Sequence, residues 1–110
     1  MIQGDIYEAY LNPTKGNELD GMRPVVIISG ESMNNYTNLR IICPLTSKVK
    51  KYPGGVILKP TTENGLTETS EILVSQIRTI STAIFIKKIG TIQSTEIKEI
   101  LEGLNDILTL

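Results

Sequence analysis

The chain has 110 residues and eleven basic against twelve acidic side chains, so it is almost neutral at pH 7. A chain of this length forms one domain, in which about 65% of the unfolded surface can be buried without disulfides or structural metals. The charge balance argues against a protein covered with nucleic-acid contacts, and the lack of histidine argues against a zinc enzyme.

The single cysteine, Cys43, has no partner for an internal disulfide and lies among apolar neighbours. These features predict a reducing compartment and a buried, inert thiol. The first residues lack the pattern of a secretion signal, and no apolar run approaches the roughly twenty residues that span a membrane. We therefore expect a soluble, cytoplasmic protein.

The first predicted element is a strand over residues 4–11, where Tyr7, Ala9 and Leu11 fall on one face. A polar, glycine-containing loop follows. Pro24 suits the first residue of the next strand, over residues 24–29, because proline has no N–H to donate. The branched apolar residues after Pro24 show no alternation, which predicts a strand that is buried on both faces.

Arg23 immediately precedes this strand, which places a permanent cation at the rim of the predicted β core. A turn or short helix is expected at residues 30–35, and a third strand at residues 39–45 leads into the hydroxyls of Thr46 and Ser47. If the second and third strands pair, the guanidinium and the two hydroxyls can converge on a phosphate. The three bases of the following loop are Lys48, Lys50 and Lys51.

Further short strands are expected at residues 56–58, 71–76 and 89–92. The pair Asn64-Gly65 predicts a tight turn before the second of these, because both residue types tolerate positive φ. Residues from 84 onward predict a turn or short helix that runs into the last strand.

The C-terminal segment predicts a helix with Ser94 as its N-cap and Glu96 in its first turn. Gly103 should weaken this helix by about 1 kcal/mol relative to alanine. Several short strands followed by one amphipathic helix predict an α+β, mostly β fold, a small antiparallel barrel with the helix laid against it. The expected apolar face of the helix consists of Ile97, Ile100, Leu101, Leu104, Ile107 and Leu108.

Five segments, in this order, resemble the MazF, PemK and Kid family of bacterial toxin endoribonucleases over nearly the whole chain. The resemblance implies one toxin domain over residues 1–110, with an SH3-like barrel of the CcdB/Kid/MazF type that forms a homodimer. The segments are Gly4-Asp5-Ile6-Tyr7, Asn12-Pro13-Thr14, Gly16-x-Glu18-x-x-Gly21-x-Arg23-Pro24, Pro44-Leu45-Thr46-Ser47 and Ser75-Gln76-Ile77-Arg78-Thr79.

The resemblance also implies an activity: sequence-selective cleavage of single-stranded RNA or mRNA without a metal or other cofactor. The ribose 2′-OH attacks the adjacent phosphorus and leaves a 2′,3′-cyclic phosphate and a free 5′-OH. Such a toxin is silenced by a cognate antitoxin. This chemistry suits a chain without histidine, because the substrate supplies the nucleophile and the protein aligns it and stabilises charge.

By the same resemblance, Arg23 stabilises charge on the phosphate, Thr46 orients the phosphate or the 2′-OH, and Glu18 is the candidate general base. Ser75 stands where several relatives carry a carboxylate, so the identity of the general base stays open. Either Glu18 is the base, or Ser75 indicates an enzyme with altered RNA choice or weakened activity. The expected RNA contacts are Ser47, Lys48, Lys50, Lys51, Ser75, Gln76 and Arg78.

Structural roles compete with each of these assignments. Arg23 can pair with Glu18 or Asp20 on the surface. The hydroxyls of Thr46 and Ser47 can cap a turn, and loop lysines are often only solvated charges. Two other functions also stay open. One is a non-catalytic, CcdB-like inhibitor of DNA gyrase, and the other is an inert RNA- or peptide-binding barrel.

Overall fold

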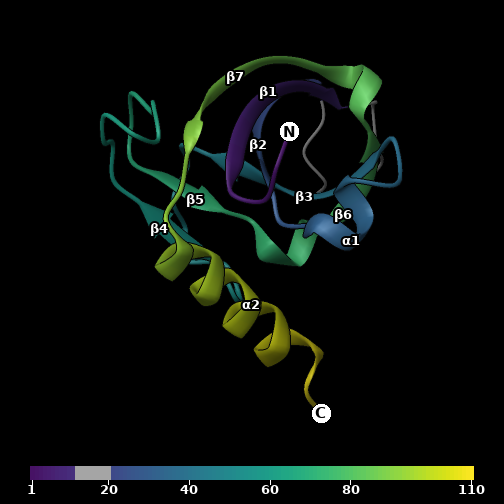
Figure 1. Ribbon diagram of the computed structural model, residues 1–110. Helices are drawn as coiled ribbons and strands as arrows, with labels where there is room; N and C mark the ends of the chain where they lie inside the picture. The colour runs from purple at the N-terminus through teal and green to yellow at the C-terminus, as the bar shows by residue number, and fades with distance from the viewer. Residues whose placement is uncertain (12–20) are drawn as a thin grey trace.

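The structure, a computed structural model, describes residues 1–11 and 21–110, which form a strongly curved sheet with one long helix against it (Figure 1). The elements in chain order are β1 (Asp5–Leu11), β2 (Gly21–Ile27), α1 (Glu31–Asn34), β3 (Leu39–Thr46), β4 (Val56–Leu58), β5 (Ser70–Ile72), η1 (Val74–Gln76), β6 (Arg78–Ser81), η2 (Thr82–Ile84), β7 (Phe85–Thr91) and α2 (Ser94–Leu108).

The strands pair antiparallel in the order β4-β5-β3-β2-β1-β7, and β6 pairs with the first half of β3. β3 is the central strand, because it pairs with β2 on one side and with β6 and then β5 on the other. Among the described strands, β7 pairs only with β1 and β4 only with β5, so the barrel stays open. The predicted mostly β, antiparallel fold with a C-terminal helix is confirmed.

The sheet buries apolar side chains on both faces, in two separate clusters. Along β1, Ile6 belongs to the cluster that α2 covers, whereas Ala9 and Leu11 belong to the other, as the alternation predicts. Val25 and Val26 of β2 have no exposed surface and point into different clusters. The absence of alternation in β2 therefore identified a strand buried on both faces.

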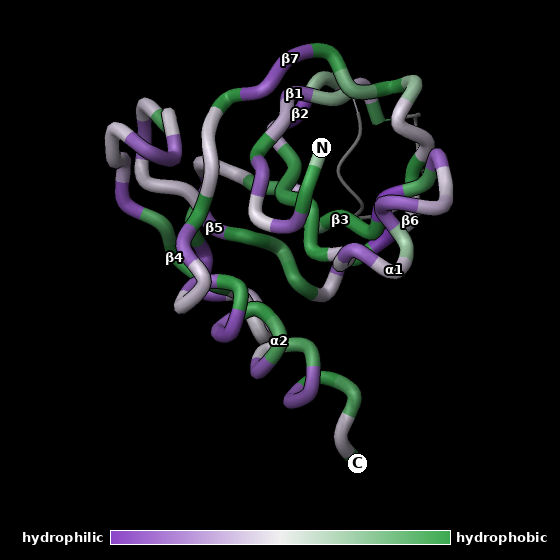
Figure 2. The backbone as a smooth tube through the Cα atoms, in the orientation of Figure 1, coloured by the Kyte–Doolittle hydropathy of each residue, from purple (hydrophilic) through white to green (hydrophobic). Residues whose placement is uncertain are grey.

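Helix α2 begins with a cap one residue earlier than predicted. The N-cap is Gln93 rather than Ser94, and the Gln93 N–H donates to the Glu96 carboxylate at 2.8 Å in a capping box. Ile100 is fully buried, but Leu101 and Leu108 of the predicted apolar face are 48% and 73% exposed. Figure 2 shows hydrophobic and hydrophilic stretches alternating along the helix. The face that packs is thus narrower than the sequence predicts.

Several strands differ from prediction. The strand expected at residues 71–76 ends at Ile72, because the Gln76 N–H donates to the Leu73 carbonyl at 3.0 Å and the chain turns into η1. β2 begins at Gly21, so Pro24 is inside the strand, which is possible because pairing with β3 begins only at Val25. β6 was not predicted, since it is short and polar, with Ile80 as its one buried residue. β7 begins at Phe85 rather than near residue 89, and the sequence hid its first half because Ile86, Lys87 and Lys88 are consecutive exposed residues without an apolar alternation.

The packing of α2 on the turn before β4 requires a glycine in the helix. Gly103 is buried, and a Cβ built there would overlap the backbone carbonyl of Gly54. Backbone atoms cannot move aside as a flexible side chain can. Gly103 therefore allows the α2 backbone to approach the Gly54 backbone closely. The sequence indicates only that this glycine lowers the helix propensity.

We expect Gly103→Ala to lower the melting temperature, although alanine favours the isolated helix by about 1 kcal/mol. Overpacking of a close contact typically costs about 1 to 3 kcal/mol and should exceed that gain. Glu102→Ala, at an exposed position of the same helix, is the matched control and should leave thermal unfolding nearly unchanged. A melting temperature raised by Gly103→Ala would contradict the close packing of α2.

Candidate active site

The pairing of β2 with β3 brings the two predicted site strands together. Val25 lies opposite Pro44 and Val26 opposite Cys43. Continued by two residues, this register sets Arg23 beside Thr46. Both residues line one pocket of about 230 Å³, here called the Arg23–Thr46 pocket. β2, β3 and the residue after β3 contribute six of the lining residues: Met22, Arg23, Pro24, Leu45, Thr46 and Ser47.

Arg23 is the third residue of β2 and lies opposite Ala9 of β1. Arg23 is half-buried and lines the pocket, so it is neither sunk in the core nor fully in solvent. The rigid pairing of β2 with β1 fixes the backbone that carries it. A guanidinium held in this way presents several N–H donors in a fixed plane, which suits the recognition of phosphate oxygens.

Thr46 is the last residue of β3, and only 7% of it is exposed. Its Oγ1 accepts a hydrogen bond from the Lys48 N–H at 3.2 Å. The hydroxyl hydrogen can still donate, because a threonine hydroxyl is one donor as well as an acceptor. The turn-capping role that the sequence left open is therefore present, and it also orients the hydroxyl at the edge of the Arg23–Thr46 pocket.

The rest of this pocket comes from residues that the sequence analysis did not single out. They belong to the β4–β5 loop, residues 59–69, and to the start of β5. The Ser70 hydroxyl donates to the Glu68 carbonyl at 3.0 Å and so fixes the end of the loop. The lining from this side consists of Leu66, Thr67, Glu68 and Ser70.

The β4–β5 loop is held in place by a buried asparagine. Asn64 is 2% exposed; its Oδ1 accepts from the Thr61 and Leu66 N–H groups, and its Nδ2 donates to the Lys59 carbonyl. Gly65 has a φ of +66°, and Gly90 of β7 lies so close to Asn64 that a Cβ would overlap its backbone. The Asn64-Gly65 pair predicted a turn, but nothing in the sequence showed that this turn delivers Glu68 to the pocket.

The other predicted RNA contacts lie elsewhere. Ser75, Gln76 and Arg78 line a second pocket of about 220 Å³, formed by η1 and the start of β6. The two pockets have no lining residue in common. Glu18, the candidate base, lies outside the described residues.

The three lysines after β3 are all exposed, and they lie on residues 47–52, here called the lysine loop. Their side chains face solvent, whereas the backbone of the loop is fixed by hydrogen bonds to a buried side chain. The Lys50, Lys51 and Tyr52 N–H groups all donate to the carboxylate of Glu71, which is fully buried. Glu71 was expected only as part of a strand, because a strand pattern does not distinguish a solvated glutamate from a buried one.

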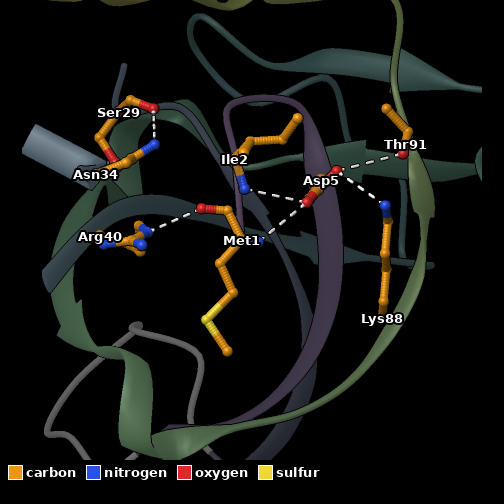
Figure 3. Close-up of polar contacts among 8 residues, drawn as sticks. All are labelled: Met1, Ile2, Asp5, Ser29, Asn34, Arg40, Lys88 and Thr91. Carbon is orange, nitrogen blue, oxygen red and sulfur yellow. Dashed lines mark hydrogen bonds and ion pairs between the residues drawn. The ribbon is translucent and has the colours of Figure 1, made fainter. Parts of the chain in front are cut away.

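Asp5 of the Gly-Asp-Ile segment has a structural environment (Figure 3). Its buried carboxylate accepts from the Ile2 N–H at 3.0 Å and lies 3.3 Å from the Lys88 Nζ. The hydroxyl of Thr91 also donates to it, at 3.4 Å. These contacts join β1 to β7 and account for Asp5 without a catalytic role.

No three histidine, cysteine, aspartate or glutamate side chains gather to hold a metal ion within residues 1–11 and 21–110. Over the same residues, every helix is too short or too polar to cross a membrane.

Comparison with known families matches residues 2–108 to the PemK-like, MazF-like toxin of type II toxin-antitoxin systems. The chain belongs to this family. Endoribonuclease MazF9 of Mycobacterium tuberculosis is 32% identical over 94% of this chain and 92% of the relative. Endoribonuclease MazF of Staphylococcus saprophyticus is also 32% identical, over 100% of this chain and 92% of the relative.

Solved structures have the same fold as this MazF-like chain. A crystal structure of MazF from Deinococcus radiodurans covers 100% of this chain and 97% of its own, with a TM-score of 0.81 and 24% identity. A MazE-MazF crystal structure from the same organism gives a TM-score of 0.74 at 23% identity, over 98% of this chain and 95% of the matched chain. The Arg23–Thr46 pocket therefore lies on the scaffold of the MazF toxins.

Cys43 of this MazF-like chain is fully buried on β3, and burial raises the pKa of its thiol to about 12. The thiolate is the reactive form, so the raised pKa keeps the thiol protonated and inert at pH 8. We expect iodoacetamide at pH 8 to leave the folded protein unmodified and to label Cys43 fully in guanidinium chloride, as measured by intact mass. Rapid labelling of the folded protein would contradict the buried position.

Proposed function

We propose that this MazF-like chain is a sequence-selective endoribonuclease toxin that cuts single-stranded RNA by attack of the ribose 2′-OH. The observation that supports this most is the pocket that Arg23 and Thr46 share. Family membership and the likeness to two curated endoribonucleases support the same activity. In this function the whole chain, residues 1–110, acts as one toxin domain.

In this reaction the 2′-oxygen forms a bond to phosphorus while the bond from phosphorus to the 5′-oxygen breaks. One proton leaves the 2′-OH and one reaches the departing 5′-oxygen, so the products are a 2′,3′-cyclic phosphate and a 5′-OH. The Arg23 guanidinium stabilises the negative charge that builds up on the non-bridging oxygens. The Thr46 hydroxyl donates to the phosphate and orients it. Neither role requires a metal ion.

Two carboxylates are candidates to take the proton from the 2′-OH. Glu18 has this role by family resemblance, whereas Glu68 lines the Arg23–Thr46 pocket. A carboxylate next to a bound phosphate becomes a stronger base when RNA excludes water, because desolvation and the phosphate charge both disfavour its ionised form. We assign the base to Glu18 and a contact with an RNA base amino group to Glu68.

The RNA strand would extend from this pocket over the neighbouring basic and polar groups. The exposed ammonium groups of Lys48, Lys50 and Lys51 attract the phosphate backbone. Gln76 and Arg78 offer hydrogen bonds at the second pocket, next to Ser75. Ser47 lies beside Thr46 in the first pocket and adds a further hydroxyl.

Two related structures support an antitoxin as a partner. The MazE-MazF structure from Deinococcus radiodurans contains the toxin with MazE, and an endoribonuclease from a mycobacterial species was solved in complex with its cognate antitoxin. We propose that a cognate antitoxin silences this chain too, that the active form is a homodimer, and that it acts in the cytoplasm.

We expect Arg23→Ala and Thr46→Val each to lower kcat by about 100- to 1,000-fold, the usual effect of losing one donor to a developing negative charge. The assay is cleavage of mixed-sequence RNA in EDTA, with the fragment ends tested for cyclic phosphate. Arg23→Lys should restore little activity, because an ammonium lacks the planar fork of donors. Thr46→Ser should restore much of it.

The matched controls are Lys98→Ala, which removes a positive charge, and Thr95→Val, which removes a hydroxyl, both at exposed positions of α2. They should cut RNA like the wild type. Equal loss of activity in the controls, or RNA left intact by the wild type, would refute the proposed site or the proposed activity respectively.

The identity of the base can be read from pH–rate profiles. Loss of a general base typically lowers kcat by about 100- to 10,000-fold and removes the rise of rate with pH on the acidic side. We expect Glu18→Gln to show both effects, and Glu68→Gln to keep the acidic limb while changing which sequences are cut. Glu63→Gln, at an exposed position of the β4–β5 loop, is the control. The opposite pattern would transfer the role of base to Glu68.

A further inference from the structure

The chain contains a buried carboxylate that the proposed reaction does not use. Glu71 lies on β5 with 0% of its surface exposed. The Lys50 and Lys51 N–H groups donate to its Oε1 at 3.0 Å each, and the Tyr52 N–H donates to its Oε2 at 2.7 Å. Both carboxylate oxygens are therefore satisfied by consecutive backbone donors of the lysine loop.

The lysine loop is shaped around this carboxylate. Lys51 has a φ of 55°, and it is the one residue other than glycine with positive φ in residues 1–11 and 21–110. Such a conformation turns successive N–H groups toward one point and makes a concave anion site. Gly55 completes the enclosure, because a Cβ there would overlap Oε2 of Glu71. The loop thus binds an anion that belongs to the chain itself.

The same carboxylate is close to the proposed reaction centre in the sheet. Glu71 lies opposite Thr46 in the pairing of β5 with β3, and residues opposite each other place their side chains on the same face. The Thr46 hydroxyl accepts from the Lys48 N–H at the start of the lysine loop, and Glu71 accepts from its last three residues. The loop is therefore fixed at both ends next to the Arg23–Thr46 pocket.

We propose that Glu71 is a positioning residue for RNA: its buried carboxylate fixes the lysine loop so that Lys48, Lys50 and Lys51 hold the strand at the Arg23–Thr46 pocket. This inference rests on the proposed function. Because backbone N–H groups satisfy the carboxylate, the three ammonium groups stay exposed and available for phosphates. A loop ordered before binding loses less conformational entropy when RNA binds.

The test is Glu71→Gln in the full chain, with Glu63→Gln as the matched control. Glutamine keeps the shape but replaces one acceptor oxygen by an NH₂ group, which leaves a loop N–H without its acceptor. Hydrogen exchange should speed up by about tenfold or more at the amides of residues 50–52, beyond any change at the core amides. The KM for a short RNA should rise by about tenfold or more, while kcat changes less, because Arg23 is untouched.

Binding of a 2′-O-methyl RNA, which cannot be cut, separates this inference from the proposed activity. Weaker binding by Glu71→Gln than by Glu63→Gln supports the positioning role even if the wild type leaves ordinary RNA intact, a result that would refute only the cleavage. Faster exchange of the loop amides with unchanged KM and unchanged binding would overturn the proposal. Unchanged exchange at residues 50–52 would overturn it as well.

A second pair of variants tests the same contact if Glu71→Gln fails to fold. Gly55→Ala presses a methyl group on the carboxylate while retaining its charge, and it should raise KM and loop exchange in the same direction. Gly30→Ala is its control, because a Cβ at residue 30 meets no atom within 4 Å. Equal KM and binding for these two variants would also overturn the proposal.

Discussion

The antiparallel register between β2 and β3 is the constraint on which the site depends. Val25 opposite Pro44 and Val26 opposite Cys43 set Arg23 and Thr46 at the same level of the sheet. A slip of one residue would exchange the β2 side chains between the two apolar clusters and separate Arg23 from Thr46. The close packing of both clusters around side chains of different shape resists such an exchange. The same packing energy that stabilises the fold therefore aligns the two groups proposed for catalysis.

The loops around the site are positioned by backbone close approaches rather than by many side-chain contacts. Gly90 allows β7 to touch the β4–β5 loop, and the Thr91 N–H donates to the Glu63 carbonyl at 2.8 Å. Gly103 allows α2 to touch the turn at Gly54. In each case a polar loop lies against a regular element at a distance that only glycine permits. The open barrel can thus hold the β4–β5 loop and the turn at Gly54 firmly without enlarging its core.

Sequence patterns predicted the parts of the fold that follow from local periodicity. The alternation in β1, the uninterrupted apolar run in β2 and the helical spacing of α2 each identified their element, and Arg23, Thr46 and Ser47 were expected to converge if β2 and β3 paired. The family resemblance supplied the chemical interpretation of that convergence.

What the sequence did not predict depends on contacts between distant segments. Glu71 gives the same local signal whether it faces water or a set of backbone donors. Glu68 lies in a loop that the buried Asn64 and other distant contacts hold in place, and Gly103 lies against the backbone of Gly54. Leu101 and Leu108 fit the helical period but remain exposed in the folded chain.

The described edge of the sheet at β7 also limits how two copies of this chain can meet. Its middle carries Lys87 and Lys88, and its end is occupied by the β4–β5 loop through the Thr91 N–H. Charged residues and covering loops are the usual means by which natural sheets discourage the addition of a foreign strand. A strand added across β7 would have to pack beside the exposed Lys87 and Lys88 side chains and displace that loop. Fibre-like growth along this edge is thereby discouraged.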